Sequence, residues 1–431
     1  MKRDSSRYIT GFRKAILYTY ISLSVMLKYL TRPALFQWSL RAFCLFLLRS
    51  FRLLLAFRHH KAVRVEGGYK LDLYLPAFPS KAFFSALEGK VIRKPPSPVT
   101  VVFSTTKACQ YRCSHCYQRK DENADMDETL MVDTAKALQE MGVAMFDIEG
   151  GEPFLRYSRL LSLIKSLDER SELWVNTTGA GIKSGMLEEL KKYGLFGLMI
   201  SIHSPDPKNH DALTGVEGSF DLACKTVGQC RAVGLTAAIN SVLSEEEVRI
   251  GGLDRLMFLA RKLDADFVQL IHPKPAGMWL GHKQGMQTDP GLIAFIQQEH
   301  IRYNSHRYAD YPSLSAQVFE ESEKTFGCTS GGIDRFYVNA SGEIQPCEFL
   351  NISFGNVRDE PLTTVFARMR SAYTEPCCDW LCVSQGENIY HLMERYETHV
   401  TPLPWTIVSK LVKEWHRGKP TPLYEKLGIY R

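Results

Sequence analysis

Three cysteines, Cys109, Cys113 and Cys116, lie within one eight-residue stretch in a C-x3-C-x2-C arrangement. Three neighbouring thiolates can hold three irons of an iron-sulfur cube and leave the fourth iron open to a small molecule. An electron-carrying cluster or a structural zinc normally takes four protein ligands instead. The spacing therefore indicates chemistry at a metal cluster, although taken alone it also fits a zinc or structural site.

A glycine-rich segment follows in the chain, where an apolar run ends in Gly150, Gly151, Glu152 and Pro153. Glycines let a backbone approach a ligand closely, and a carboxylate suits an ammonium group. Together with the cysteines, this segment resembles the radical SAM superfamily. The resemblance implies that Cys109, Cys113 and Cys116 hold a 4Fe-4S cluster, and that Gly150, Gly151, Glu152 and Pro153 bind the amino group of S-adenosylmethionine.

The same resemblance implies the reaction. An electron from the cluster would cleave S-adenosylmethionine to a 5′-deoxyadenosyl radical, which abstracts a hydrogen atom from a substrate. The electron would come from a flavodoxin- or ferredoxin-type donor. The sequence identifies no catalytic acid or base, and a protein whose clusters only transfer electrons or sense redox state is an open alternative.

Alternating strand and helix patterns follow from residue 100 onward. Helical-period segments at 133–141, 159–167, 185–193 and 220–233 lie between apolar strand segments at 100–104, 145–148, 173–176, 197–202, 236–242 and 267–271. Such βα units predict an α/β fold with a parallel sheet and a site at the carboxyl ends of the strands. The resemblance specifies a partial (β/α)6 TIM-like barrel.

Further cofactor contacts rest on weaker matches to the family pattern. Ser201 and Asn240 resemble residues that contact the methionine carboxylate or the ribose, and hydroxyl or amide groups satisfied by the backbone are the alternative. His203 and Ser204 stand where the family often has aspartate and glycine, which weakens the match. His115 takes the position of an aromatic residue beside the third cysteine, so we expect it to pack near the adenine rather than bind metal.

A second cysteine group lies beyond the predicted barrel and consists of Cys328, Cys347, Cys377, Cys378 and Cys382. Gly342 marks a hairpin turn between the first two of them. The pattern resembles the SPASM or twitch domains of radical SAM enzymes, but five cysteines suffice for only one cluster. The resemblance implies a second, auxiliary 4Fe-4S cluster. Its predicted ligands are Cys328, Cys347, Cys382 and Cys378, with Cys377 as the alternative to Cys378 and a zinc site as the alternative metal centre.

The first 65 residues combine positive charge with apolar runs. Thirteen Lys or Arg residues stand against the single Asp4, a net charge of +12, so the rest of the chain sums to −6. This distribution argues against a nucleic-acid partner. The apolar runs are shorter than the roughly 20 residues of a membrane span, or are broken by arginine. The pattern is typical of interfacial helices, and a helical layer packed on the barrel or on a second copy is the alternative.

These features divide the chain into five parts. We predict a basic apolar helical segment (1–65), a connector (66–95), the radical SAM barrel (96–310), a small α+β auxiliary-cluster domain (320–385) and a helical tail (386–431). We expect a cytoplasmic protein, peripheral on the cytoplasmic membrane face through residues 1–60. The three remaining cysteines, Cys44, Cys224 and Cys230, are expected to be buried apolar residues.

The substrate is unknown from the sequence. A hydrophobic or membrane-associated metabolite would explain the N-terminal segment. A ribosomal-peptide maturase is the alternative, since SPASM and twitch enzymes often modify peptides, but residues 1–95 do not resemble the leader-binding module that such enzymes often carry.

Overall fold

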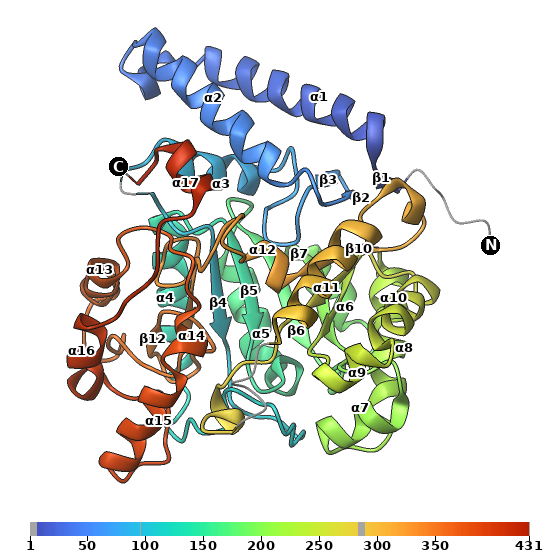
Figure 1. The fold of residues 1–431 in the computed structure, drawn as a ribbon, viewed down its shortest axis with the longest axis vertical. Helices are drawn as coiled ribbons and strands as arrows, with labels where there is room; N and C mark the ends of the chain where they lie inside the picture. The colour runs from blue at the N-terminus through green and yellow to red at the C-terminus, as the bar shows by residue number, and fades with distance from the viewer. Residues whose placement is uncertain (1–6, 95, 283–288, 431) are drawn as a thin grey trace.

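The computed structural model describes residues 7–94, 96–282 and 289–430. A nine-stranded sheet in the order β10-β9-β8-β7-β6-β5-β4-β11-β12 forms its centre (Figure 1). The strands are β4 (Thr100–Ser104), β5 (Met145–Glu149), β6 (Glu172–Thr177), β7 (Leu195–Ser201), β8 (Thr236–Ser241), β9 (Phe267–Leu270), β10 (Ser313–Ala316), β11 (Arg335–Val338) and β12 (Ile344–Gln345). All neighbours are parallel except β11 and β12.

Helices cover the outer face of this sheet. They are α4 (Glu128–Met141), α5 (Tyr157–Ser166), α6 (Met186–Lys192), α7 (Pro207–Thr214), α8 (Ser219–Val233), α9 (Glu245–Arg249), α10 (Gly252–Lys262), α11 (Pro290–Tyr303) and α12 (Gln317–Glu320). Side chains alternate along the strands, so Val101 and Phe103 pack outward in the main core while Val102 lines a cavity inside the sheet. The six predicted strands and four predicted helices are all present, which confirms the α/β fold.

The sheet extends beyond the six predicted strands at both ends. Strand β10 joins β9, and β11 pairs in parallel with β4. The hairpin β11–β12 turns at Gly342, as predicted, with a φ of 92° that favours glycine. The predicted auxiliary region is therefore continuous with the barrel sheet. This region also contains α13 (Leu362–Ala372) and α14 (Leu381–Ser384), and the predicted tail (386–431) contains α15 (Gly386–Arg395), α16 (Trp405–Lys413) and α17 (Pro422–Leu427).

The N-terminal residues form a layer across the amino ends of the barrel strands (Figure 1). This layer consists of β1 (Tyr8–Ile9), α1 (Gly11–Leu30), η1 (Pro33–Phe36), α2 (Leu40–Ala56), β2 (Ala62–Val65), β3 (Gly68–Lys70) and α3 (Lys81–Val91). Tyr8, Val63 and Leu73 pack against Trp174 and Phe267 inside the barrel, so the layer closes the barrel at the amino ends of its strands.

The connector (66–95) contains strand β3, which pairs with β2, and helix α3, and residues 71–76 between them form no helix or strand. Residues 1–6 of the predicted N-terminal segment, and residue 95 of the connector, lie outside the described residues. Within the described ranges, none of the helices has both the length and the apolar character that crossing a membrane requires.

Candidate functional site

The loop between β4 and α4 carries the first three cysteines over a cavity at the carboxyl ends of the strands. This cavity has a volume of about 510 Å³. The predicted site residues that line it are Cys109, Cys113, Cys116, His115, Gly150, Gly151, Ser201 and Asn240. The structure therefore brings together eight side chains or backbone positions that come from four separate strand ends.

The two glycines allow the cysteine loop to approach the end of β5. A Cβ atom at Gly150 would lie 2.5 Å from the carbonyl oxygen of Thr106, and one at Gly151 would lie 2.4 Å from that of Ala108. The Gly151 N–H also donates to the Thr106 carbonyl oxygen at 2.6 Å. No larger side chain fits either position, so these glycines hold the cysteine loop close to the sheet.

Glu152 and Pro153 are placed differently from the other predicted cofactor residues, since neither lines the cavity. The Glu152 carboxylate is fully buried and accepts hydrogen bonds from Thr177, Thr178 and the Phe154 N–H. Burial raises its pKa, which these hydrogen bonds oppose. In this structure Glu152 anchors the segment after β6, and direct contact with S-adenosylmethionine stays a prediction.

His115 packs against aromatic side chains at the cavity wall, and its place near the adenine stays a prediction. Its Nε2 atom lies 3.2 Å from Nε2 of His203, and its ring centroid lies 5.7 Å from that of Trp279. His203 Nδ1 accepts a hydrogen bond from the Val242 N–H, so its Nε2 carries the proton donated to His115. Burial lowers the pKa of His115 to about 4, and the pair is therefore neutral near pH 7.

The inner surface of the barrel carries acidic residues that the sequence analysis did not single out. Asp147 on β5 accepts a hydrogen bond from Asn176 Nδ2 at 2.8 Å, and both line the cavity with Glu149 and Glu348. Burial, followed by the Glu348 charge, raises the pKa of Asp147 to about 7. A carboxylate in the middle of an otherwise apolar strand was the available signal.

Two observations test whether this cavity suits a cluster and S-adenosylmethionine. Burial raises the pKa of the Cys109 thiol to about 11 and that of Cys113 to about 12, and the neighbouring cysteines add to both shifts. A bound iron would offset this cost, since a coordinated thiol is deprotonated. The Asn240 Oδ1 atom is buried without a hydrogen-bond partner, so the cavity offers an acceptor to a ligand hydroxyl. The residues that line this cavity therefore fit both a cluster and S-adenosylmethionine.

A second, smaller cavity of about 10 Å³ collects part of the auxiliary cysteine group. Cys328, Cys347 and Cys382 line it, but Cys377 and Cys378 do not. The Cys377 carbonyl oxygen accepts a hydrogen bond from the Cys328 N–H at 2.8 Å, which places this residue beside the group. Cys378 instead has its Sγ atom 3.3 Å from Asp379 Oδ1. Neither candidate for the fourth ligand therefore lines the cavity, but Cys377 lies beside Cys328 whereas the predicted Cys378 contacts Asp379.

Two cations border this smaller cavity. Lys274 lines both cavities, its Nζ atom is buried without a hydrogen-bond partner, and it lies 3.3 Å from the Trp380 ring centroid. Arg335 also lines the smaller cavity, and its Nε atom is unpartnered. A cluster held by thiolates carries negative charge, so these buried cations fit an anionic metal centre at this position.

The other cysteines follow the prediction in part. Cys230 is buried and Cys224 is half-buried among apolar residues. Cys44 is exposed, so the prediction that it is buried was wrong, because it lies on the same exposed side of α2 as Leu48 and Phe51.

Comparisons with known proteins agree with this site. The Radical SAM superfamily model matches residues 103–248. The AdoMet-dependent heme synthase of Nitratidesulfovibrio vulgaris is 24% identical over 323 residues, covering 68% of this chain and 87% of the relative. The PqqA peptide cyclase of Xanthomonas campestris pv. campestris is 24% identical over 302 residues, covering 65% of this chain and 78% of the relative.

Among solved structures, Streptococcus suis SuiB bound to the precursor peptide SuiA has a TM-score of 0.50 and 18% identity, over 66% of this chain and 67% of that chain. This likeness shows the fold. The fold, the cysteine loop and the family match together identify a radical SAM domain over residues 103–248, and the chain is an enzyme that carries this domain. Enzymes of this class use a 4Fe-4S cluster with S-adenosylmethionine, and their SPASM or twitch members carry an auxiliary cluster.

Proposed function

We propose that the chain is a radical SAM enzyme that works at a membrane surface on a hydrophobic or membrane-associated metabolite. The observation that carries this proposal is a continuous exposed apolar face on the N-terminal layer. On α1 this face consists of Phe12, Ile16, Tyr20, Leu23, Leu27 and Leu30, and on and before α2 of Leu35, Trp38, Leu40, Leu45, Leu48, Phe51 and Leu55.

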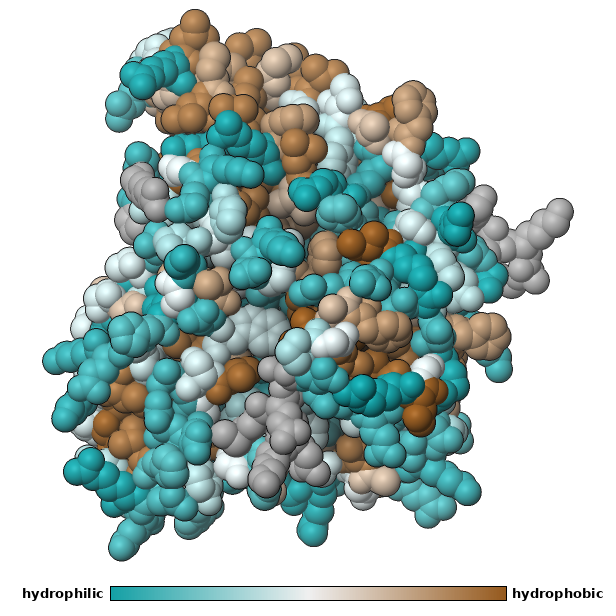
Figure 2. All heavy atoms as spheres, in the orientation of Figure 1, coloured by the Kyte–Doolittle hydropathy of each residue, from teal (hydrophilic) through white to brown (hydrophobic). Residues whose placement is uncertain are grey.

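We call this exposed apolar surface the membrane face, and the spacing of its residues follows the helical period. On α1 the exposed apolar residues recur every three or four positions, opposite an inner stripe that includes Leu17, Ile21 and Val25. Phe12 is 81% exposed and Trp38 is 78% exposed. Figure 2 shows apolar residues gathered over α1 and α2. A patch of this extent on one face marks an interaction surface.

The charge of the same segment favours an anionic lipid surface as the partner. Neither α1 nor α2 contains an acidic residue, and Arg13, Arg32, Arg41 and Arg58 are exposed on or beside them. Long cationic side chains beside apolar ones are typical of interfacial helices. We infer a peripheral position on the cytoplasmic membrane face.

Two arginines of α2 contact the end of the chain, the half-buried Arg49 and the exposed Arg52. Arg49 Nε donates to the Leu427 carbonyl oxygen at 2.8 Å, and Arg52 Nη1 donates to that of Lys426 at 2.7 Å. Both therefore bind the carbonyl end of α17, where a cation also complements the helix dipole. These bonds fasten the end of the chain to α2 and hold the membrane face rigidly on the enzyme.

In this proposal the residues of the catalytic cavity hold the cluster and S-adenosylmethionine in position. When bound, the cluster and S-adenosylmethionine supply a radical that abstracts a hydrogen atom from the substrate. We assign Cys109, Cys113 and Cys116 to the cluster, and Ser201 and Asn240 to polar groups of S-adenosylmethionine. The neutral His115 packs beside them and excludes water from the cavity wall. A flavodoxin- or ferredoxin-type protein is the proposed electron donor.

For the auxiliary cluster we assign Cys328, Cys347 and Cys382, as predicted, and we now favour Cys377 over Cys378 as the fourth ligand. Cys377 faces Cys328 across an isolated antiparallel bridge. Lys274 and Arg335 would balance the charge of the cluster. A zinc centre would use the same ligands.

Flotation with lipid vesicles tests the membrane proposal. The full chain should float with vesicles that contain phosphatidylglycerol and bind less to vesicles of phosphatidylcholine alone. A Leu23→Glu/Leu27→Glu double variant should reduce binding at least about tenfold, because two apolar side chains leave the interface. The matched control is Ile250→Glu/Phe258→Glu, which changes two equally exposed apolar residues of the barrel. Equal losses in both double variants would reject the proposal.

A peptide substrate is the second candidate, because one relative is named a PqqA peptide cyclase. It predicts that the enzyme forms 5′-deoxyadenosine faster with a precursor peptide than without one, and that the Leu23→Glu/Leu27→Glu variant works equally well on it.

A further inference from the structure

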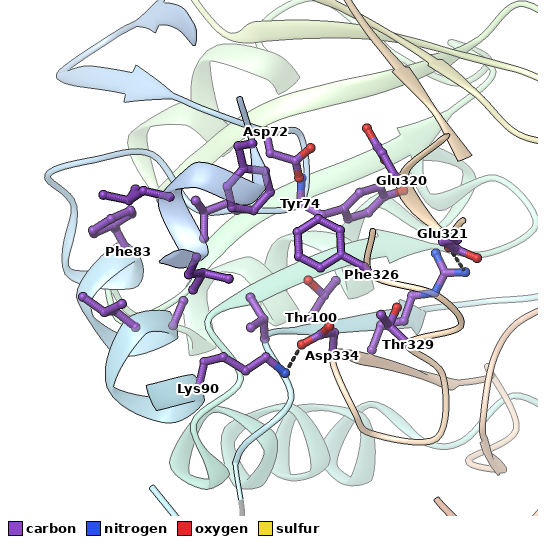
Figure 3. A pocket seen from close by; sticks show the side chains of 18 of the residues that line it. Asp72, Tyr74, Phe83, Lys90, Thr100, Glu320, Glu321, Phe326, Thr329 and Asp334 are labelled. Atoms are coloured by element: carbon purple, nitrogen blue, oxygen red, sulfur yellow. Dashed lines mark hydrogen bonds and ion pairs between the residues drawn. The ribbon is translucent and has the colours of Figure 1, made fainter. Parts of the chain in front are cut away.

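A cavity of about 140 Å³ lies between the N-terminal layer and the amino ends of the barrel strands (Figure 3). Three helices make its apolar wall. This wall consists of Val25 from α1, Leu53, Leu54 and Phe57 from or beside α2, and Phe83 and Leu87 from α3. An engineered apolar cavity of roughly 150 Å³ stays dry and takes up benzene, so this space accepts a hydrocarbon group of similar size.

The opposite wall of the cavity is polar, but its charges are already paired. Lys90 forms an ion pair with Asp334, which Figure 3 shows as a dashed contact. Arg335 lies 2.9 Å from Glu321. Both cations on this wall, within the part of the chain that the structure describes, therefore have acidic partners, and a phosphate or carboxylate would find no free positive charge.

The remaining acidic groups on this wall are also satisfied without a ligand cation. Asp72 lies 3.1 Å from His60 Nδ1. Glu320 accepts a hydrogen bond from the Ser315 hydroxyl at 2.6 Å and lies 3.7 Å from His60 Nδ1, and burial raises its pKa. The polar groups of the cavity therefore already have protein partners, which suits an uncharged hydroxyl better than an ion.

Tyr74 separates this cavity from the catalytic one. It lines both cavities, and its hydroxyl accepts a hydrogen bond from Gln269 Nε2 on β9. A molecule in the cavity thus lies one side chain away from the space in which the radical chemistry takes place.

Helix α2 separates the cavity from the membrane face. Leu54 is 5% exposed and lines the cavity, whereas its neighbour Leu55 is 38% exposed on the membrane face. The same helix therefore presents one apolar side to the proposed lipid surface and the other to the cavity. A chain leaving the membrane at this layer would have only the thickness of one helix to pass.

We propose that this cavity binds the hydrocarbon chain of an uncharged, hydroxyl-bearing amphiphile, as the apolar part of the substrate. The inference rests on the proposed membrane-surface function, since it takes the membrane as the source of the chain. It deepens that proposal by naming the place of the chain and the chemistry of its polar group. Tyr74 is the boundary across which the reacting part of the molecule would reach the catalytic cavity.

Calorimetric titration of the full-length protein with 1-decanol in detergent-free buffer tests the cavity. The wild-type protein should bind 1-decanol, and decanoate should bind at least about tenfold more weakly, because a carboxylate lacks a partner on the polar wall. Leu54→Trp should lose at least about tenfold in affinity by filling the space, and Leu55→Trp on the same helix should keep the wild-type affinity within about twofold. Ala86→Phe, which fills the cavity from α3, is a second variant in case Leu54→Trp misfolds.

Vesicle flotation of the same proteins separates the two proposals. Leu54→Trp and Ala86→Phe should float like the wild-type protein, while Leu23→Glu/Leu27→Glu should lose flotation and still bind 1-decanol. Equal binding of 1-decanol by Leu54→Trp, Ala86→Phe and wild type would overturn the cavity inference. So would a wild-type protein that floats but binds no decanol, and that result would leave the membrane proposal standing. If Leu23→Glu/Leu27→Glu loses flotation but keeps its binding of 1-decanol, the result supports both the membrane proposal and the cavity inference.

Discussion

The Glu152 carboxylate accepts two hydrogen bonds from Thr178, one from its backbone N–H at 2.8 Å and one from its hydroxyl at 2.5 Å. Glu152 begins the short η2 turn (Pro153–Arg156) after β5, and Thr178 follows β6, so this contact joins two neighbouring strand ends beneath the cysteine loop. Charge-assisted hydrogen bonds of this kind are among the stronger ones in proteins. The contact makes Glu152 a support for the cofactor cavity.

Replacing Glu152 with Gln should lower the stability of the apo-protein by about 2 kcal/mol, because the amide nitrogen would face hydrogen-bond donors in a buried position. Thermal or urea unfolding of the metal-free protein measures this loss. Thr178→Val, which removes only one hydroxyl donor, should cost about 1 kcal/mol. If Glu152→Gln unfolds like the wild type and only the affinity for S-adenosylmethionine falls, the carboxylate is a ligand and not a support.

Replacing Cys109, Cys113 and Cys116 together with Ala should abolish cleavage of S-adenosylmethionine after anaerobic reconstitution. The auxiliary site should keep its metal, because its cysteines line a separate cavity. Iron and sulfide per chain, measured with 5′-deoxyadenosine formation, check both expectations. Cleavage that persists in the triple variant would show that the cluster is held elsewhere.

Cys377→Ser and Cys378→Ser distinguish the two candidates for the fourth auxiliary ligand. Because Cys377 lies opposite Cys328 and Cys378 contacts Asp379, the first variant should lose most of the auxiliary cluster absorbance and the second should retain it. Reconstitution of each variant in the background of the Cys109/Cys113/Cys116 triple variant isolates this signal. The opposite result would restore the assignment made from the C-x3-C spacing of Cys378 and Cys382.

Local sequence patterns predicted the catalytic loop well, because a strand, a loop and its cysteines are contiguous in the chain. The glycines at 150 and 151 were also found from sequence, but for another reason than the one the structure gives. Their nearest neighbours are the carbonyl oxygens of Thr106 and Ala108, more than forty residues earlier, so their packing role depends on the tertiary fold.

Contacts between distant segments could not be predicted in this way. Tyr74 meets Gln269 only because the N-terminal layer closes the barrel, and Arg49 meets α17 only because the chain returns to its beginning. Neither pairing leaves a periodic or compositional trace in the sequence. Asp147 was not predicted as a site residue, because the strand that carries it is otherwise apolar. In the structure its side chain lines the cavity inside the barrel.

Asp147 should give the protein a measurable pH dependence of stability. Its pKa in the folded protein is raised from 3.8 to about 7, first by burial and then by the charge of Glu348, while Asn176 and Arg335 oppose the shift. A raised carboxyl pKa contributes stability that is fully present below the unfolded value and is lost as the pH rises through the folded value. Wild-type stability should therefore fall between about pH 4 and pH 7 through this group.

The Asp147→Asn variant lacks this titration and keeps an acceptor oxygen for Asn176. Its thermal midpoint should match that of the wild type near pH 4 and exceed it near pH 8, where the difference in free energy could reach about 4 kcal/mol. Asp168→Asn is the control of opposite sign, because hydrogen bonds from Arg170 lower the pKa of that exposed carboxylate. Since exposed pairs contribute little, its midpoint should fall only slightly below that of the wild type as the pH rises. Parallel profiles for wild type and Asp147→Asn from pH 4 to pH 8 would mean that Asp147 is ionised within the fold, and that the barrel interior is more polar than its burial suggests.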